Sequence, residues 1–292
     1  MKVIRSNVLG FCMGVRRAVE IADDEAERVK DSGARVFSVG ELIHNPEALN
    51  DLKNKGIEIL PSLEENIKDC SVIIRAHGVA PDLENNLRDK GAYIVDATCP
   101  RVKASQLKAE ELARAGYGIF LAGEKSHAEI EGILGYVQSC NAPFCVVVDN
   151  PSDAGKEAKK LYKINHDIKT ALLGQSTISE ELYNSIGNAI GMFFPNLQII
   201  HTICAATKDR QQAIRELLDE VDAVIIAGGK KSANTNRLLE IAKESGKPCV
   251  LIENAGEIPP EFRSYKTVGL SAGASTPDSV VDDIERELKR KK

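Results

Sequence analysis

The clearest local signal in this chain is Tyr93-Ile94-Val95-Asp96-Ala97-Thr98-Cys99-Pro100-Arg101-Val102-Lys103. Its apolar, β-branched residues predict a strand, and Cys99 ends that strand just before Pro100 and a helical pattern that runs through Arg114. The Cys99 thiol is therefore expected at a helix N-terminus, where the helix dipole favours the thiolate.

The same order of strand, cysteine and helix occurs twice more. The N-terminal strand leads into Gly10-Phe11-Cys12-Met13-Gly14-Val15 and a helix, and a strand from Gln198 leads to Cys204 and a helix through Leu218. Each junction has a basic residue within about one helical turn of its cysteine. Three copies of one local arrangement predict an internal threefold repeat.

Strand and helix patterns alternate along the whole chain, which is typical of parallel sheets covered by helices. Placed on a circle, the predicted strands form three groups of four, and each group ends with the strand that delivers a cysteine. The strands are 35–39, 56–60, 71–76, 93–98, 118–122, 144–149, 170–174, 198–202, 223–227, 248–253, 267–271 and 2–6. We therefore predict an α/β fold of three small domains, residues 13–98, 99–203 and 204–292 with 1–12, around a pseudo-threefold axis.

The composition excludes several classes of protein. Hydrophobic residues make up 43% of the 292 residues and charged residues 28%, which argues against disorder. A formal charge of -5 and the absence of Trp argue against nucleic-acid binding. No apolar run is long enough to span a membrane and no signal peptide is recognisable, so we expect a cytoplasmic protein with no membrane contact.

Seven cysteines, an odd number, favour metal or redox chemistry over a disulfide framework. If the three segments pack about one axis, Cys12, Cys99 and Cys204 meet there, and three thiolates suit an iron–sulfur cluster or zinc. A four-iron cluster on three cysteines would leave one iron open to a substrate oxygen. The remaining cysteines are more typical of buried apolar positions: Cys70, Cys140, Cys145 and Cys249.

Polar residues follow the predicted strands in six loops at comparable positions. Ligands of open α/β sheets gather beyond the carboxyl ends of strands, so these loops are expected to line one site. Their His, Ser, Thr and Asn donors suit a small, oxygen-rich anion such as a phosphate or diphosphate. The candidates are His44, His77, His127, Ser176, Thr177, Ser232, Asn234 and Ser275.

Simpler interpretations exist for several of these residues. Zinc competes with the anion for the histidines, because Cys and His are its usual ligands. Ser176 and Thr177, like Ser232, could do no more than cap a helix. Glu129 could be the acidic first turn of a helix, but as the carboxylate two residues from His127 it is also the candidate proton donor.

Taken together, these residues resemble the LytB or IspH family of 4-hydroxy-3-methylbut-2-enyl diphosphate reductases. The resemblance covers essentially the whole chain and implies a trefoil of three α/β domains around a [4Fe–4S] cluster, with Cys12, Cys99 and Cys204 as its ligands. The matching stretches, in order, are Gly10-Phe11-Cys12-Met13-Gly14-Val15, Ile43-His44-Asn45-Pro46, Arg75-Ala76-His77-Gly78-Val79, Asp96-Ala97-Thr98-Cys99-Pro100 and Ser271-Ala272-Gly273-Ala274-Ser275.

The resemblance also implies a reaction. The family converts its hydroxylated diphosphate to isopentenyl and dimethylallyl diphosphate, the last step of the methylerythritol phosphate route to isoprenoids, with electrons from reduced ferredoxin or flavodoxin. The implied catalytic residues are Glu129, Ser176, Thr177 and His127, of which Glu129 and the Ser-Thr pair relay protons. The implied diphosphate ligands are His44, His77, His127, Ser176, Thr177, Ser232, Asn234 and Ser275.

Two positions depart from the family pattern. Ala128 stands where a proline is usual, which should alter the stiffness of the loop more than its chemistry. Ala233 stands where a serine is usual, so one hydroxyl donor to the diphosphate is missing and a backbone N–H is expected in its place. Two other functional classes stay open: an iron–sulfur hydro-lyase, and a zinc-stabilised or redox-sensing binding protein.

Overall fold

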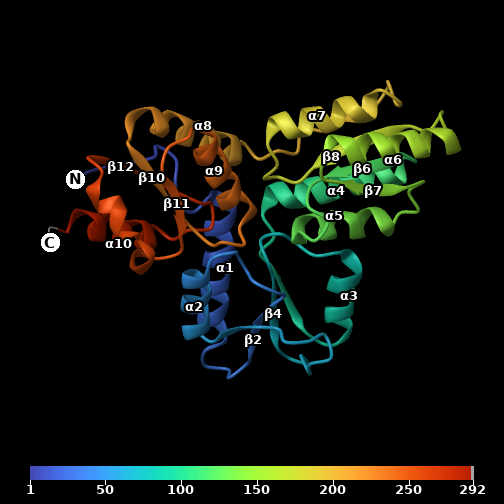
Figure 1. The fold of residues 1–292 in the computed structure, drawn as a ribbon. Coiled ribbons are helices and arrows are strands. Elements are labelled where there is room, and N and C mark those ends of the chain that lie inside the picture. Colours follow the sequence, from blue (N-terminus) through green and yellow to red (C-terminus); the bar gives the residue numbers. More distant parts are fainter. Residues whose placement is uncertain (291–292) are drawn as a thin grey trace. The chain divides into compact units, whose positions relative to one another are not determined.

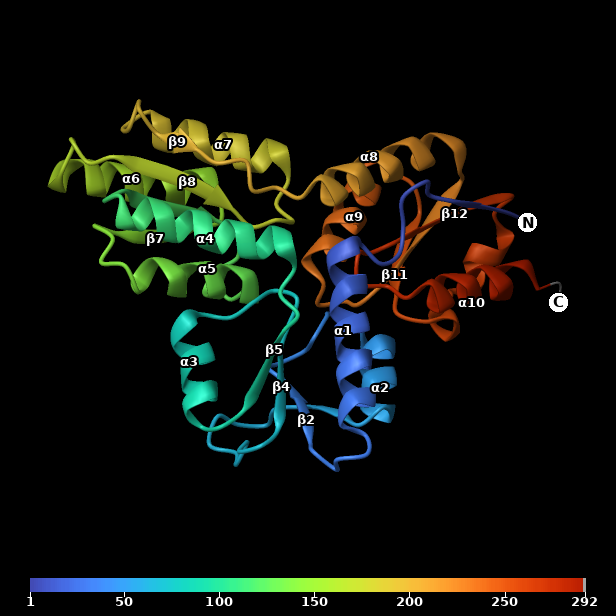
Figure 2. The same ribbon diagram turned by 180° about the vertical axis from the view of Figure 1, so that it is seen from behind.

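The computed structural model describes residues 1–290, which form three four-stranded sheets covered by helices (Figures 1 and 2). Each sheet contains one of the three predicted groups of strands, and the strand pairs within them are parallel. The predicted α/β fold class with three parallel sheets is therefore confirmed. The chain divides into two compact units, residues 1–60 with 205–292 and residues 61–204, and the boundaries of the three domains stay a prediction.

The first sheet lies in the unit formed by residues 1–60 and 205–292. Its strands, in spatial order, are β1 (Lys2–Arg5), β12 (Thr267–Ala272), β10 (Ala223–Ala227) and β11 (Cys249–Ile252). One face packs against helices α8 (Ala205–Glu220) and α9 (Ala233–Glu244), and the other against α10 (Asp278–Lys289) and the short 3-10 helices η1 (Ala255–Glu257) and η2 (Pro260–Ser264). The register pairs Ala227 with Ala272, so the loops that begin at Gly228 and Gly273 leave the sheet side by side.

The second sheet contains β2 (Val36–Ser38), β3 (Ile57–Ile59), β4 (Ser71–Ile74) and β5 (Tyr93–Asp96). β2 is parallel to β3, and β4 is parallel to β5 with Ile74 opposite Asp96. Helices α1 (Met13–Val29) and α2 (Pro46–Asn54) belong to the same unit as β2, and α3 (Pro81–Asp89) belongs to that of β4. Proline opens both α2 and α3, because its missing N–H would have no partner in the first turn.

The third sheet lies within residues 61–204 and has the order β7 (Cys145–Val148), β6 (Gly118–Ala122), β8 (Thr170–Gly174) and β9 (Gln198–Ile199). Helices α4 (Pro100–Arg114) and α5 (Ala128–Gln138) cover one face, and α6 (Pro151–Ile164) and α7 (Glu180–Gly191) cover the other (Figure 2). β9 is shorter than the predicted strand 198–202 because the Thr202 hydroxyl takes the place of a backbone partner for β8. This hydroxyl accepts a hydrogen bond from the Gly174 N–H and donates one to the Gly174 carbonyl, both at 2.7 Å.

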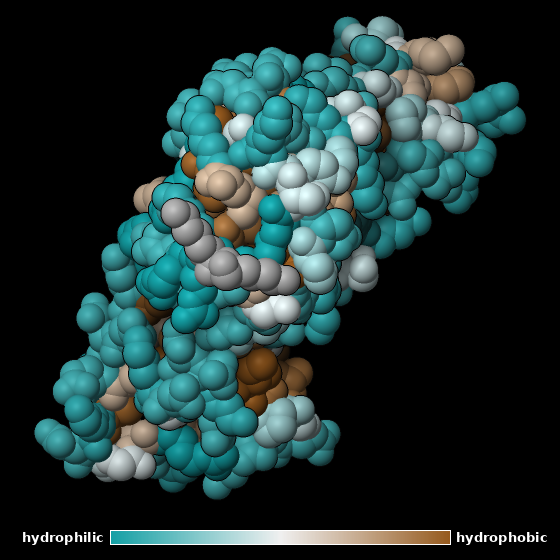
Figure 3. All heavy atoms as spheres, turned by 60° about the vertical axis from the view of Figure 1, so that its left-hand side comes forward, coloured by the Kyte–Doolittle hydropathy of each residue, from teal (hydrophilic) through white to brown (hydrophobic). Residues whose placement is uncertain are grey.

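On the face drawn in Figure 3, hydrophilic residues predominate and hydrophobic residues appear in small, separate groups. Among the most exposed large apolar side chains of the described residues are Met192 and Ile164. Isolated apolar side chains of this kind are normal on a protein surface. Within residues 1–290, no helix combines the length and the apolar character that crossing a membrane requires.

Candidate functional site

Glu129 has a buried carboxyl group that is held by one residue, Ser176, of the loop after β8. It lies in the first turn of α5 and is 1% exposed. Its Oε1 accepts the backbone N–H of Ser176 at 2.8 Å, and its Oε2 accepts the Ser176 hydroxyl at 2.7 Å. Burial raises the pKa of Glu129, and the two hydrogen bonds from Ser176 only partly oppose that rise. A raised pKa of this kind is typical of carboxyl groups that act as proton donors.

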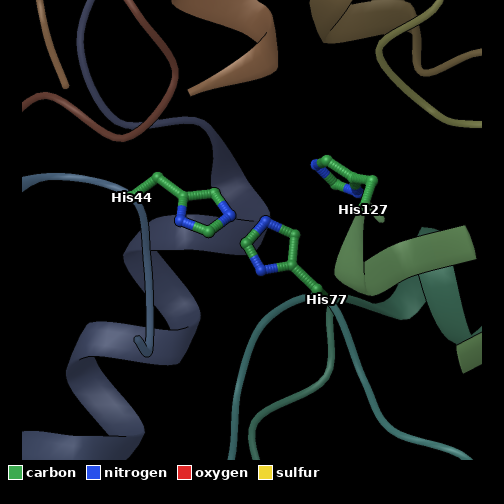
Figure 4. Close-up of side chains that lie close together, drawn as sticks. All are labelled: His44, His77 and His127. Atoms are coloured by element: carbon green, nitrogen blue, oxygen red, sulfur yellow. The ribbon is translucent and has the colours of Figure 1, made fainter. Parts of the chain in front are cut away.

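His127 and His77 lie next to each other, and His127 is two residues before Glu129 (Figure 4). Their rings are perpendicular, with centroids 5.3 Å apart. His127 is the N-cap of α5, and its Nδ1 accepts the Glu129 backbone N–H at 3.2 Å. In the neutral ring the proton therefore resides on Nε2, which can donate it to a ligand.

Ser176 joins Glu129 to Cys204. While its N–H and hydroxyl bind the carboxyl group, its backbone carbonyl accepts the Cys204 N–H at 3.0 Å. Cys204 directly precedes α8, as expected for a thiol at a helix N-terminus. Neither Ser176 nor Thr177 caps the following helix, because Ser179 is the N-cap of α7. The simpler interpretation of these two residues as helix caps is therefore wrong.

Thr177 has a different partner from its neighbour. Its hydroxyl accepts the side-chain amide of Gln175 at 2.8 Å, and the Oε1 of Gln175 accepts the Glu124 N–H at 3.1 Å. Gln175 thereby connects the loop after β8 with the loop that leads to His127. Our sequence reasoning missed Gln175, although its place between Gly174 and Ser176 at a strand end was a usable signal. The catalytic role of Thr177 stays a prediction.

Cys99 is held beside the loop that carries His77. It is the N-cap of α4, and its N–H donates to the Ala76 carbonyl at 2.9 Å. The next turn of that loop needs glycine, because Gly78 has φ +71° and a Cβ there would lie 2.4 Å from the Nε2 of Gln106. Within residues 61–204 the fold thus ties Cys99 to the His77 loop and Cys204 to the partner of Glu129.

Cys12 belongs to the other unit and is the N-cap of α1. Its Sγ accepts the Val15 N–H at 3.4 Å, and its own N–H donates to the Ala274 carbonyl at 3.0 Å. The three predicted junctions of strand, cysteine and helix are therefore present. That the sulfurs of Cys12, Cys99 and Cys204 meet at one point stays a prediction.

The remaining cysteines are poorer metal ligands. Burial raises the pKa of Cys145 to about 12, and burial also raises the pKa of Cys249. Cys70 is buried just before β4, and the Cys140 thiol donates to the Tyr136 carbonyl at 3.3 Å. Because metals bind the thiolate, the raised pKa values of Cys145 and Cys249 disfavour ligation.

His44 and Ser275 are joined in the unit formed by residues 1–60 and 205–292. The Ser275 hydroxyl donates to the His44 carbonyl at 3.1 Å, and the His44 Nδ1 lies 3.0 Å from the Glu41 Oε2. Burial opposes the ionisation of Glu41, but its hydrogen bond to His44 and the charge of Lys231 outweigh it, so the pKa of Glu41 is lowered. The ionised Glu41 orients the His44 ring and favours a proton on its Nδ1.

The first turn of α9 presents several donors in the same unit. Ser232 is its N-cap, with Oγ accepting the Thr235 N–H at 3.4 Å, as its simpler interpretation required. Ala233 opens the helix, where a backbone N–H has no intrahelical acceptor. Asn234 is 4% exposed, and its Nδ2 has no hydrogen-bond acceptor among the described residues. A buried donor without an acceptor suits an anionic ligand.

We expect Ser176→Ala to lower turnover about tenfold. One step of a proton relay should contribute less to the rate than a complete general acid does, for which about 10²–10⁴-fold is typical. Losing the hydroxyl should raise the pKa of Glu129 further, since that hydrogen bond lowers it. The basic limb of the pH profile of kcat should therefore move to higher pH. Ser179→Ala is the control: it removes the α7 cap and should reduce stability by about 1 kcal/mol without moving the profile. An unmoved profile in Ser176→Ala would remove Ser176 from the relay.

These features define a class of protein: a three-sheet α/β protein with cysteines at helix N-termini and a buried glutamic acid on a helix that one of two adjacent histidines caps. The chain belongs to the LytB protein family, which matches residues 3–289.

Named relatives and solved structures match nearly the whole chain. It is 40% identical to the 4-hydroxy-3-methylbut-2-enyl diphosphate reductase of Treponema denticola over 99% of both chains, and 41% identical to that of Aquifex aeolicus over 98% of this chain and 95% of the relative. A solved structure of (E)-4-hydroxy-3-methyl-but-2-enyl diphosphate reductase, described as the terminal enzyme of the non-mevalonate pathway, matches with a TM-score of 0.72, 40% identity and 99% of both chains. The reductase structure from Plasmodium falciparum matches with a TM-score of 0.89 over 99% of this chain and 88% of that one; at 24% identity it supports the fold alone.

Proposed function

We propose that this chain reduces (E)-4-hydroxy-3-methylbut-2-enyl diphosphate to isopentenyl diphosphate and dimethylallyl diphosphate. Its membership of the LytB family and its 40% identity to a relative named for this reaction support the proposal. The observation that carries it is the hydrogen-bonded series from Glu129 through Ser176 to Cys204. This series holds the backbone of a candidate metal ligand beside the partner of a buried proton donor, and a reductive loss of water needs both protons and electrons.

The reaction breaks one carbon–oxygen bond and forms one carbon–hydrogen bond. Two electrons enter, one proton goes to the departing hydroxyl to give water, and a second goes to either end of the allylic group. Glu129 supplies the first proton, because burial keeps it protonated to higher pH than an exposed carboxyl group. Since a hydroxyl both donates and accepts, Ser176 can pass that proton on.

The diphosphate would be held by donors from the carboxyl edges of the sheets. In one unit these are the Asn234 amide, the hydroxyls of Ser232 and Ser275, and the backbone N–H of Ala233 in place of the missing hydroxyl. The helix dipole of α9 adds to them. His44, His77 and His127 would add ring N–H groups, and anchoring of this kind holds the allylic group still while it is protonated.

The cysteines fit an iron–sulfur cluster by their chemistry. Cys12, Cys99 and Cys204 are soft donors at helix N-termini, and none of them forms a disulfide bond. These three residues would hold a [4Fe–4S] cluster, which when bound supplies electrons one at a time. Zinc would fit the same thiols but supplies no electrons.

The chain would act in the cytoplasm as the last enzyme of the methylerythritol phosphate route. Reduced ferredoxin or flavodoxin would be the electron donor, because each delivers single electrons. Neither a membrane nor a nucleic acid is part of the proposal.

Anaerobic purification followed by two measurements tests the function. We expect iron and acid-labile sulfide in the isolated protein, and oxidation of two reduced methyl viologen molecules per hydroxylated diphosphate consumed. Mass spectrometry should identify isopentenyl and dimethylallyl diphosphate. Zinc without sulfide would favour the binding-protein alternative, and turnover without consumption of reductant would favour the hydro-lyase.

A further inference from the structure

Arg210 connects the helix that follows Cys204 with the loop that precedes Cys12. It lies on α8 and is 3% exposed. Its Nη2 donates to the Gly10 carbonyl at 2.6 Å, and its Nη1 donates to the Ala206 carbonyl at 3.0 Å. Gly10 is two residues before Cys12, and Cys204 directly precedes α8. One side chain thus joins the loop before Cys12 to the first turn of α8.

The loop before Cys12 is also enclosed by the connection between β12 and α10. Gly10 has φ +75°, and a Cβ there would lie 2.7 Å from the Asp278 Oδ1 and 3.6 Å from the Thr276 carbonyl. Two residues later, the Cys12 N–H donates to the Ala274 carbonyl. The backbone at residues 10 and 12 is therefore held both by α8 and by the β12–α10 connection.

Arginine is an unusual residue at this position of α8. It is on the stripe that also contains Ile214 and Leu217, which are buried against the sheet. A buried guanidinium stays charged, and burying a charge opposes folding unless the surroundings compensate it. A charged residue in an apolar stripe was the sequence signal that our reasoning missed.

We propose that Arg210 is a positioning residue for the metal ligand Cys12, and that its buried positive charge raises the reduction potential of the group that Cys12 holds. The guanidinium binds the Gly10 carbonyl to α8 and thereby fixes the orientation of the Cys12 side chain. Nearby charge and hydrogen bonding are established determinants of iron–sulfur potentials. The inference rests on the proposed function, because it requires Cys12 to be a cluster ligand.

Three variants test the role of Arg210 in anaerobically purified holoprotein. Arg210→Met removes the charge and the hydrogen bonds while keeping a side chain of similar length. Arg210→Lys keeps the charge but lacks the planar fork that binds two carbonyl groups. Arg215→Met is the matched control, since Arg215 lies on the same helix and donates to the Gln211 carbonyl of that helix. Iron and sulfide content, iron loss to a chelator and the midpoint potential from a redox titration followed by EPR are measured for each.

We expect Arg210→Met to lose iron about 10–100-fold faster than wild type, the range typical of lost outer-shell partners, and to have a lower midpoint potential. The melting temperature of its metal-free form should stay near that of wild type, because an apolar side chain replaces a buried charge. Arg210→Lys should lose iron faster yet keep most of the wild-type potential, and it carries the test if Arg210→Met fails to fold. Arg215→Met should match wild type in every measurement.

Either of two results would overturn the role of Arg210. One is wild-type iron retention and midpoint potential in Arg210→Met. The other is a midpoint potential in Arg210→Lys as low as that expected for complete loss of the charge. A wild-type protein that contains neither iron nor sulfide would instead overturn the proposed function. The two failures are therefore distinguishable.

Discussion

Glu129→Gln is expected to lower turnover by about 10²–10⁴-fold, the contribution typical of a general acid, while the cluster and substrate binding are retained. The amide is close in size to the carboxyl group, and its oxygen can still accept the Ser176 N–H. Its NH₂ group faces the Ser176 hydroxyl, which can rotate to accept. Single-turnover kinetics with reduced protein would measure the loss, and a wild-type rate would exclude Glu129 as the proton donor.

The stability of the same variant provides a control for correct folding. Because burial raises the pKa of Glu129 above its ordinary 4.5, the folded protein keeps this proton over a pH range in which the unfolded chain has released it. The free energy of unfolding of wild type therefore falls as the pH rises above about 4.5, and Glu129→Gln lacks this fall. Urea unfolding should find the variant more stable than wild type at pH 7, with the difference vanishing below pH 4. If the variant were less stable than wild type at pH 7, its loss of activity would be explained by misfolding.

Cys99→Ser is expected to abolish the brown absorbance of anaerobically purified protein. Loss of a direct ligand should weaken metal binding by more than the about 10–100-fold typical of an outer-shell change, because serine offers a hard oxygen to a soft metal. Iron and sulfide should fall together, and activity with them. The fold should persist, since the Cys99 N–H that binds the Ala76 carbonyl is unchanged.

Cys140→Ser is the matched control for that substitution. Serine can repeat the hydrogen bond that the Cys140 thiol makes to the Tyr136 carbonyl. We expect wild-type iron and sulfide in this variant. Wild-type contents in both variants would contradict the ligand role of Cys99, and a loss in both would indicate general instability of the cluster.

The strands were predictable because apolar β-branched runs have few alternatives inside an α/β protein. The run Ala223–Ala227 is completely buried, as parallel strands with helices on both faces require. Prediction failed at the end of β9, where the Thr202 hydroxyl takes over the hydrogen bonds of Gly174. Side chains that substitute for backbone partners leave no mark on the hydropathy pattern.

The candidate residues of the site were predictable by type and by position after strands. Their partners were not. Glu129 was identified from its spacing to His127, but Ser176, which binds its carboxyl group, lies 47 residues away. Gln175 and Arg210 were missed because each acts on the backbone of a loop that is distant in the sequence, Gln175 on the Glu124 N–H and Arg210 on the Gly10 carbonyl.

The sequence by itself determined the three sheets, the cysteines at helix N-termini and the chemistry of the loop residues, because periodicity and residue type are local properties. Only the tertiary structure decided that Glu129 is buried, that Ser176 connects it to Cys204, and that Arg210 fastens the loop before Cys12. Burial and hydrogen bonding between distant loops depend on strand register and helix packing, which bring together residues that the chain itself keeps far apart.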